Sequence, residues 1–409
     1  MKKFVVLLSI VSAFALSAAS AMAAEPIKIG FIFILSGRVG DFGMVAKQGA
    51  EVAVDQINQA GGIGGRKILG VYEDETADSE NSAKAFRKLV NEDKVDAVVG
   101  IISSKVAGDL VPLIKVSRTP VIVSTAMTPV ITGTECNRYT FRVTWSASQN
   151  LKAAAKLAAT LKSRKWTTVG PDYALGHESW DLFQKYLKIF NPDVKYAAKS
   201  ETQFAPLTNN DWSAQIKNIM SSDADGVLIS LWGGNLVDFV KQANAAGFFD
   251  GKREALLTTA AVNSFISLGA ELPAGLWTVA PYWHLASNSK VNADFLKAYE
   301  DKFKTEPAYQ AHFAYAAVKA YAAAAEQSGS TDKEAIVNTL EGFTFEAPVG
   351  KITFRKEDHQ ALFDVVAGQT GTQMTLGSGR RAFRNLQSLI TFQANEIAIP
   401  VEETGCSMK

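Results

Sequence analysis

The sequence is poor in the side chains that most often carry catalysis or bind metal ions. It holds two cysteines, Cys136 and Cys406, and four histidines among 409 residues. No two histidines stand four residues apart and no His-Glu-x-x-His motif occurs, which argues against a zinc site. A Gly-x-Ser-x-Gly nucleophile elbow is also missing. We therefore assign no catalytic residue, no metal ligand and no cofactor, and we do not expect an enzyme.

An excess of charge of one sign is lacking as well. The chain has 42 lysines and arginines against 41 aspartates and glutamates, and this balance argues against nucleic acid as a partner. Long apolar runs are missing beyond the first residues, because no later segment reaches the roughly 18 apolar residues of a membrane-spanning helix. We expect a water-soluble protein.

The first 23 residues have the pattern of a secretory signal peptide. Lys2 and Lys3 precede an apolar stretch over residues 4–16, and small residues lead to Ala21-Met22-Ala23, a typical cleavage site. Cleavage near Ala23 would leave residues 24–409, which suit two domains of ordinary size better than one core.

The predicted export bears on the redox state of the two cysteines. In an oxidising compartment, two cysteines most simply form one disulfide. A bond between Cys136 and Cys406 would tie the C-terminal tail, residues 391–409, back to a loop much earlier in the chain.

Short β-type runs alternate with helical periods along the chain. This alternation predicts parallel sheets covered by helices. The same alternation of strands and helices begins again after about residue 147, which predicts a second α/β domain. Thr331-x-x-Glu334 predicts a capping box that opens a later helix, and the polar stretch 368–381 predicts loops. The strands are expected at 28–35, 67–72, 95–102, 119–125, 166–170, 225–232 and 275–283, and helices at 44–60, 79–92, 105–117, 147–163, 290–304 and 310–328.

The glycine-rich segment 60–68, AGGIGGRKI, is not a nucleotide-binding loop. It follows a predicted helix and precedes a strand, whereas a dinucleotide fingerprint follows a strand and opens a helix. Gly61 and Gly62 instead fit a left-handed helix C-cap.

Two other stretches suit an anion better: Ser103-Ser104-Lys105 and residues 124–128. Both follow strands at their carboxyl ends, where hydroxyls and amides can hold a carboxylate; the alternative is that they only form caps and turns.

The order of several segments resembles that of the type I periplasmic solute-binding proteins of the leucine/isoleucine/valine-binding family, which feed ABC importers. The N-terminal part IGFIFILSGRVGDFG and GAEVAVDQINQAGGIGGRKI is similar to that family's signature. VDAVVGIISS, TPVIVSTAMTP, PDYALG, DWSAQI, DGVLISLWGGN, HFAYAAVKAYAAAAE and GKITFRKEDHQ continue the series. The resemblance covers most of the chain after residue 23.

The resemblance implies an α/β fold of two Rossmann-like lobes, each a parallel sheet flanked by helices, joined by a three-strand hinge with a ligand cleft between the lobes. The crossings are expected near 142–147, 276–283 and 345–351. Lobe one is expected to comprise 24–144 plus 280–348, and lobe two 145–279 plus 349–390. The implied partners are a small carboxylate-bearing ligand and an inner-membrane permease with its ATPase subunits. The location is the periplasm, and the expected state is a monomer.

The resemblance also implies ligand-binding residues. On lobe one, Ser103 or Ser104 would hold the ligand's carboxylate side together with Ala126 and Thr128. Phe42 would lie against the ligand. Tyr173 and Trp232 would contribute from lobe two.

One departure from the family pattern bears on the ligand. Branched-chain amino acid binders use a lobe-two acid for the ammonium group, but the corresponding stretch here, 256–263, has Ala260 and Ala261 near that place. Either Asp172 or Glu178 replaces this acid, or the ligand has no ammonium group. Tyr282 and Trp283 either line the cleft or pack in the hinge.

Three interpretations of the function stay open. An importer component for an aliphatic amino acid has the family precedent, and the same scaffold binding a benzoate- or cinnamate-like acid is the alternative. A periplasmic sensor subunit that presents its solute to a membrane receptor would have the same cleft and different partners.

Overall fold

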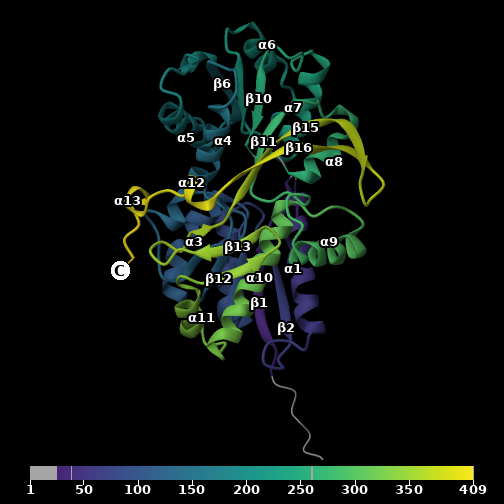
Figure 1. The fold of residues 1–409 in the computed structure, drawn as a ribbon. Coiled ribbons are helices and arrows are strands. Elements are labelled where there is room, and N and C mark those ends of the chain that lie inside the picture. The colour runs from purple at the N-terminus through teal and green to yellow at the C-terminus, as the bar shows by residue number, and fades with distance from the viewer. Residues whose placement is uncertain (1–24, 38, 259–260, 409) are drawn as a thin grey trace, which may run out of the picture.

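The computed structural model describes residues 25–37, 39–258 and 261–408. The predicted signal peptide, together with Thr259 and Ala260 of the stretch without an acid, lies outside the described residues. Two α/β lobes lie one above the other in Figure 1. None of the helices in the described ranges combines the length and the apolar character that crossing a membrane requires.

Lobe one is built on a parallel sheet with the strand order β2-β1-β3-β4-β5. Its strands are β1 (Ile27–Phe33), β2 (Ile68–Asp74), β3 (Ala97–Gly100), β4 (Val121–Val123) and β5 (Thr140–Arg142). Its helices are α1 (Gly40–Gln59), α2 (Ser79–Arg87), α3 (Ser104–Ser117), α9 (Lys290–Phe303), α10 (Tyr309–Ser328) and α11 (Lys333–Leu340). The buried strands are rich in isoleucine, valine and phenylalanine, as a sheet covered on both faces requires.

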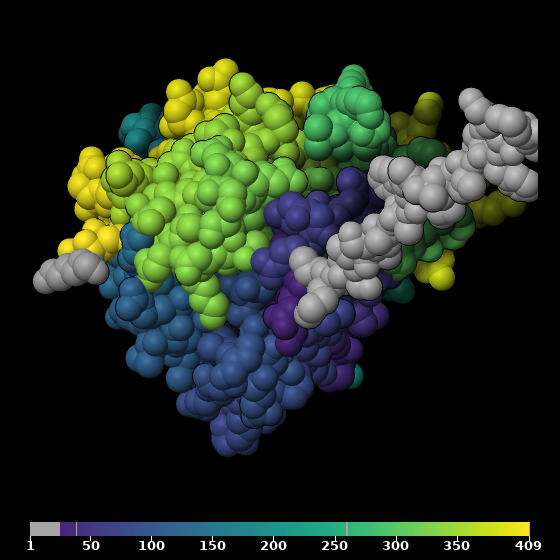
Figure 2. Space-filling model, turned by 90° about the horizontal axis from the view of Figure 1, so that it is seen from below, coloured from purple at the N-terminus to yellow at the C-terminus, as the bar shows by residue number. Residues whose placement is uncertain are grey.

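Two separate stretches of chain make up this lobe. From below, the green surface of α10 and α11 lies beside the purple and blue surface of the N-terminal segments (Figure 2). Helices α1 and α10 pack along each other, and Gly49 permits the close approach. A Cβ atom at Gly49 would lie 1.9 Å from the carbonyl oxygen of Ala311, so only glycine fits there.

Lobe two contains the second sheet, with the order β16-β15-β11-β10-β9-β6-β7 and with β8 also paired to β6. Its parallel strands are β6 (Lys165–Pro171), β7 (Lys195–Tyr196), β8 (Gln203–Ala205), β9 (Gly226–Ile229), β10 (Glu254–Leu257) and β11 (Trp277–Ala280). Strands β15 (Val365–Leu376) and β16 (Ala382–Phe392) extend it in antiparallel fashion. Its helices are α4 (Ala147–Ala158), α5 (Ala174–Phe190), α6 (Ser213–Ser221), α7 (Gly233–Ala245) and α8 (Val262–Leu268). The two-lobed α/β fold is therefore as predicted.

A small third sheet bears on the predicted lobe boundaries. It joins β12 (Thr344–Ala347), β13 (Gly350–Phe354) and β14 (Ala361–Leu362) by antiparallel pairing. The expected boundary between residues 348 and 349 falls inside the β12–β13 hairpin. Gln360 also forms a bridge to Arg142 at the end of β5. We therefore propose that the chain returns to lobe two after β14, while the other predicted boundaries stay predictions.

Two local predictions are wrong. Residues 368–381 were expected to be loops, yet most of them form β15, whose outer half is exposed and so shows no apolar alternation. The cap of α11 is Asp332 rather than Thr331, because the Asp332 carboxylate accepts from the amides of Glu334 and Ala335. His359 closes a turn in which its amide donates to the carbonyl of Arg355 at 2.8 Å, and its buried ring stacks on Phe141 with centroids 3.9 Å apart.

The C-terminal tail runs from lobe two to lobe one. Cys136 and Cys406 form the predicted disulfide, with Cα atoms 5.5 Å apart. Before it, the short helices α12 (Ala394–Ile397) and α13 (Val401–Thr404) lie against lobe two. Lys152 donates to the carbonyl of Ala398 at 2.7 Å, and Lys185 pairs with Glu403 at 3.2 Å. The tail therefore adds a tether beside the hinge.

Candidate functional site

A cavity of about 310 Å³ lies between the two lobes. Lobe one supplies most of its lining and lobe two supplies the opposite wall. The lining residues are Ile34, Val39, Phe42, Ala77, Ile102, Ser103, Ser104, Lys105, Thr125, Met127 and Tyr309 from lobe one, and Tyr173, Leu175, Leu207 and Trp232 from lobe two. Phe42, Ser103, Ser104, Tyr173 and Trp232, which the sequence placed at the ligand, thus meet at one cavity. Their roles in binding stay predictions.

The lobe-one wall is made by loops that follow two neighbouring parallel strands. Ser103 and Ser104 come after β3, and Met127 comes after β4. The carboxyl ends of parallel strands are where open α/β sheets bind ligands. The side-chain oxygen of Ser103 caps α3 by accepting from the amide of Val106 at 3.4 Å.

The hydroxyl of Ser104 lines the cavity with its acceptor sites occupied. Its Oγ accepts from the amides of Met127 and Thr128, both at 3.2 Å. A hydroxyl has two acceptor lone pairs and one donor hydrogen. With both lone pairs occupied, the Ser104 hydrogen is the group left for a ligand oxygen.

Ala126 and Thr128 do not line the cavity. The Thr128 hydroxyl accepts from the amide of Val130 at 3.4 Å, and its carbonyl accepts from the buried Arg142 guanidinium. Ala126 is buried, and its amide donates to Ile101 at 3.0 Å. Thr125 and Met127, on either side of Ala126, face the cavity instead.

One of the amides expected to hold a carboxylate, that of Ser103, is engaged by an acid that the sequence reasoning missed. The carboxylate of Glu75 accepts from the amides of Ile102 at 2.6 Å and Ser103 at 2.7 Å. Glu75 is fully buried, and burial raises its pKa to about 7. Its position at the end of β2 in the polar run EDETAD gave no sign of burial.

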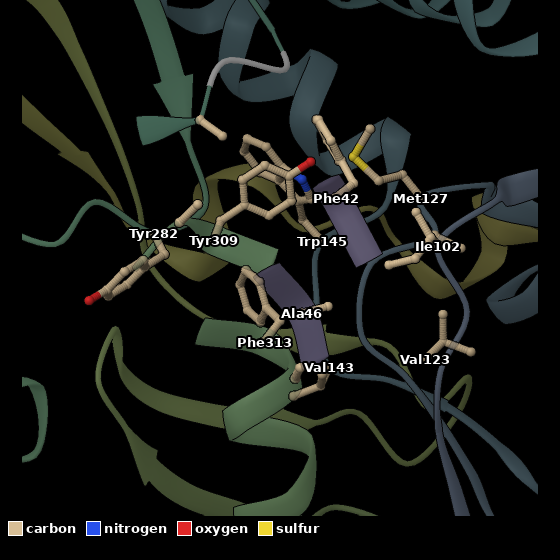
Figure 3. Close-up of a cluster of buried hydrophobic side chains, with 14 of the residues drawn as sticks. Phe42, Ala46, Ile102, Val123, Met127, Val143, Trp145, Tyr282, Tyr309 and Phe313 are labelled. Carbon is tan, nitrogen blue, oxygen red and sulfur yellow. The ribbon is translucent and has the colours of Figure 1, made fainter. Parts of the chain in front are cut away.

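Aromatic side chains close the cavity from both lobes. The rings of Phe42 and Trp232 meet edge to face, with centroids 5.0 Å apart. Trp232 Nε1 donates to the hydroxyl of Tyr173 at 3.0 Å, and burial raises the Tyr173 pKa to about 12, so this phenol stays neutral. Figure 3 shows Phe42 with Tyr309 on one side and Met127 on the other.

None of the described residues that line the cavity is acidic. Asp172 lies outside it and pairs with the Nε2 atom of His177 at 2.8 Å, with both side chains about half exposed. Glu178 also lies outside the lining, and burial raises its pKa. Ala261 is buried at the start of α8. Within the described ranges, no group of three or more histidine, cysteine or acidic side chains is arranged to hold a metal ion.

Tyr282 and Trp283 pack against side chains of α8, α9 and α10. The Tyr282 hydroxyl donates to Asn292 Oδ1 at 2.8 Å, and its ring stacks on His312 at 4.3 Å. Trp283 lies 5.5 Å from the ring of Phe265. Neither residue lines the cavity between Phe42 and Trp232, and in Figure 3 Tyr282 lies on the far side of Tyr309 from Phe42.

Comparisons with known proteins agree with this architecture. A Leu/Ile/Val-binding protein homolog from Brucella melitensis is 23% identical over 414 residues, covering 97% of this chain and 96% of the relative. An amino acid ABC transporter substrate-binding protein from Pseudomonas fluorescens superposes with a TM-score of 0.82 at 20% identity, covering 94% and 100% of the two chains. A solute-binding protein of an ABC transporter from Rhodopseudomonas palustris, in complex with 3,4-dihydroxybenzoic acid, superposes with a TM-score of 0.80 at 20% identity, covering 90% and 98%.

The family follows from the match over most of the chain. Residues 26–373 match the profile of the family described as periplasmic binding protein. The lobe-one sheet, strands β6 to β11 of the lobe-two sheet and the residues that line the cavity fall within this range, whereas β16 lies beyond it. The chain therefore belongs to the type I periplasmic binding protein family.

Proposed function

We propose that this protein is the periplasmic substrate-binding component of an ABC importer and that its two lobes close on a small carboxylate-bearing solute. The observation that supports this most strongly is the cavity between the lobes, where Phe42 of lobe one meets Trp232 of lobe two. In this proposal the signal peptide is removed near Ala23. A monomer then delivers the solute to an inner-membrane permease with its ATPase subunits.

We propose further that the solute is a small aromatic acid. The sequence alone favoured an aliphatic amino acid, but the described lining residues include the aromatic side chains Phe42, Tyr173, Trp232 and Tyr309, and none of them is acidic. A buried ammonium group without a partner would cost several kcal/mol, on the order of the cost of an unpaired buried charge. Aromatic walls suit a flat ring. The structural neighbour with 3,4-dihydroxybenzoic acid shows that this fold accommodates such a ligand.

The ligand's carboxylate has two donors in this proposal. The Ser104 hydroxyl lies on the lobe-one wall, and the Lys105 ammonium lies at the rim. Lys105 is largely exposed and pairs with Asp109 at 2.5 Å, so its attraction for an anion is screened by water and by that partner. We therefore assign the main contact to Ser104.

An aliphatic amino acid is the second candidate. It is favoured by the relative from Brucella melitensis, which is called a Leu/Ile/Val-binding protein homolog. Thermal-shift screening separates the two candidates. Benzoate and 4-hydroxybenzoate should raise the melting temperature, because a ligand at about 100 times its Kd adds about 2.7 kcal/mol of stability. If leucine or valine raises the melting temperature and the aromatic acids leave it unchanged, the aromatic proposal fails.

Replacing Ser104 by alanine should weaken binding of the aromatic acid by about 1–3 kcal/mol, since a hydrogen bond to a charged oxygen is lost. Thr128→Val is the matched control, because the Thr128 hydroxyl is turned to Val130. Calorimetric titration of both variants measures the effect. Equal losses in the two variants, or a loss in T128V alone, would show that Ser104 is not the donor.

A further inference from the structure

Glu75 lies directly behind the lobe-one wall of the cavity. It follows the last residue of β2, and its two carboxylate oxygens accept from the amides of Ile102 and Ser103. Both of these residues line the cavity. The Glu75 carboxylate is therefore hydrogen-bonded to the backbone of two residues that line the space between the lobes, although its side chain is fully buried.

The backbone around this carboxylate is strained on both sides. Thr76, Ala77 and Ile101 have φ angles of 52°, 55° and 64°. Non-glycine residues seldom adopt this left-handed region, and a β-branched residue such as Ile101 is an outlier there. Such conformations persist where surrounding contacts hold them. The two hydrogen bonds of Glu75 join the loop after β2 to the loop after β3.

The charges that face Glu75 are few. Asp74 precedes it on β2 and raises its pKa. Asp78 begins α2 and accepts from the amide of Asn81. On α3, Lys105 is paired with Asp109, so it offers Glu75 little compensation. Among the described residues, no basic side chain contributes to the shift of the Glu75 pKa, which is due mainly to burial.

We propose that Glu75 is a positioning residue that holds the ligand wall of lobe one and couples its own protonation to ligand binding. This inference rests on the proposed function, because the sign of the coupling depends on the charge of the ligand. A carboxylate in the cavity repels an ionised Glu75 across the Ile102–Ser103 peptide, so it favours the protonated form. An ammonium in the same cavity would favour the ionised form.

The direction of the pH effect follows from the position of the titration. Burial raises the Glu75 pKa from 4.5 to about 7 in the folded protein. A bound aromatic carboxylate raises it further, so protons are taken up on binding near neutral pH. Affinity for benzoate should therefore increase about threefold or more between about pH 8 and about pH 6.

The same shift sets the pH dependence of stability. Because the folded pKa lies above the ordinary value, the contribution of Glu75 is fully present below pH 4.5 and is lost as the pH rises through about 7. The melting temperature of the wild-type protein, relative to that of Glu75→Gln, should therefore fall as the pH is raised from about 5 to about 8.

Calorimetric titration with benzoate tests the proposal. It compares the wild-type protein, Glu75→Gln and the control Glu80→Gln, whose side chain is exposed on α2, in buffers of different ionisation enthalpy. The wild type and E80Q should take up protons and bind more tightly at the lower pH, and E75Q should do neither. If benzoate binds all three with the same pH dependence, the Glu75 proposal is overturned and the proposed function stands.

The remaining outcomes separate the two proposals. If leucine binds and benzoate does not, the aromatic assignment fails. Coupling through Glu75 then requires that the wild-type protein release protons on binding leucine and that E75Q not do so. If neither ligand binds, or if E75Q binds too weakly to titrate, the melting temperatures without ligand decide. A difference between wild type and E75Q that is constant with pH overturns the proposal, because the coupling requires Glu75 to titrate near neutral pH, and a difference that changes with pH supports that titration.

Discussion

Replacing Trp232 by alanine is expected to weaken binding of an aromatic acid by about 1.5–3 kcal/mol, or roughly 10- to 150-fold in Kd. Trp232 lines the cavity, meets the ring of Phe42 edge to face and donates to the Tyr173 hydroxyl. Its removal takes away one wall of the cavity together with the contact between the lobes. The ligand then loses apolar area on the face toward lobe two. Calorimetric titration with benzoate measures the change.

A second tryptophan of the same lobe provides the control. Trp277 on β11 is partly buried and does not line the cavity. Trp277→Ala should lower the melting temperature somewhat while leaving the Kd close to that of the wild type. Wild-type affinity in W232A, or an equal loss of affinity in both variants, would place the ligand away from Trp232.

Removing the disulfide is expected to lower the free energy of unfolding by about 2–4 kcal/mol. The bond closes a loop between residues 270 positions apart, and long loops gain the most from closure in the unfolded chain. The double variant Cys136→Ser and Cys406→Ser should therefore unfold at lower urea concentration. Its affinity for the ligand should change little, because neither cysteine lines the cavity.

Reduction of the wild-type protein is the matched test of this second prediction. Treatment with dithiothreitol should reproduce the loss seen in the double variant, and it should have no effect on that variant. An unchanged urea midpoint in both preparations would show that the tail is held by its contacts with Lys152 and Lys185 rather than by the disulfide.

The sequence predicted those features that leave a local pattern of residue types. Buried parallel strands appear as continuous apolar runs, so the predicted strands largely coincide with β1 to β4, β6, β9 and β11. Phe42, Ser104 and Trp232 were placed at one site by family resemblance, and the structure brings them to the same cavity. The disulfide followed from two cysteines and predicted export.

The sequence did not predict features that depend on hydrogen bonds formed outside the segment's own pattern. The segment of β15 was expected to be a loop because its composition is polar and turn-rich. It forms a strand because β11 and β16 supply its hydrogen-bonding partners. The orientation of Thr128 is decided by the turn that its hydroxyl caps. The burial of Glu75 depends on amides more than 25 residues later in the chain. Such a contact cannot be predicted from the local periodicity of the sequence.

A crystal structure of the protein with 4-hydroxybenzoate tests the central claim most directly. The account predicts that the ring lies between Phe42 and Trp232, with the carboxylate within hydrogen-bonding distance of Ser104 Oγ. An amino acid retained in the cavity, with its ammonium group held by an acidic side chain, would contradict the account, as would a ligand bound anywhere outside the space between the lobes.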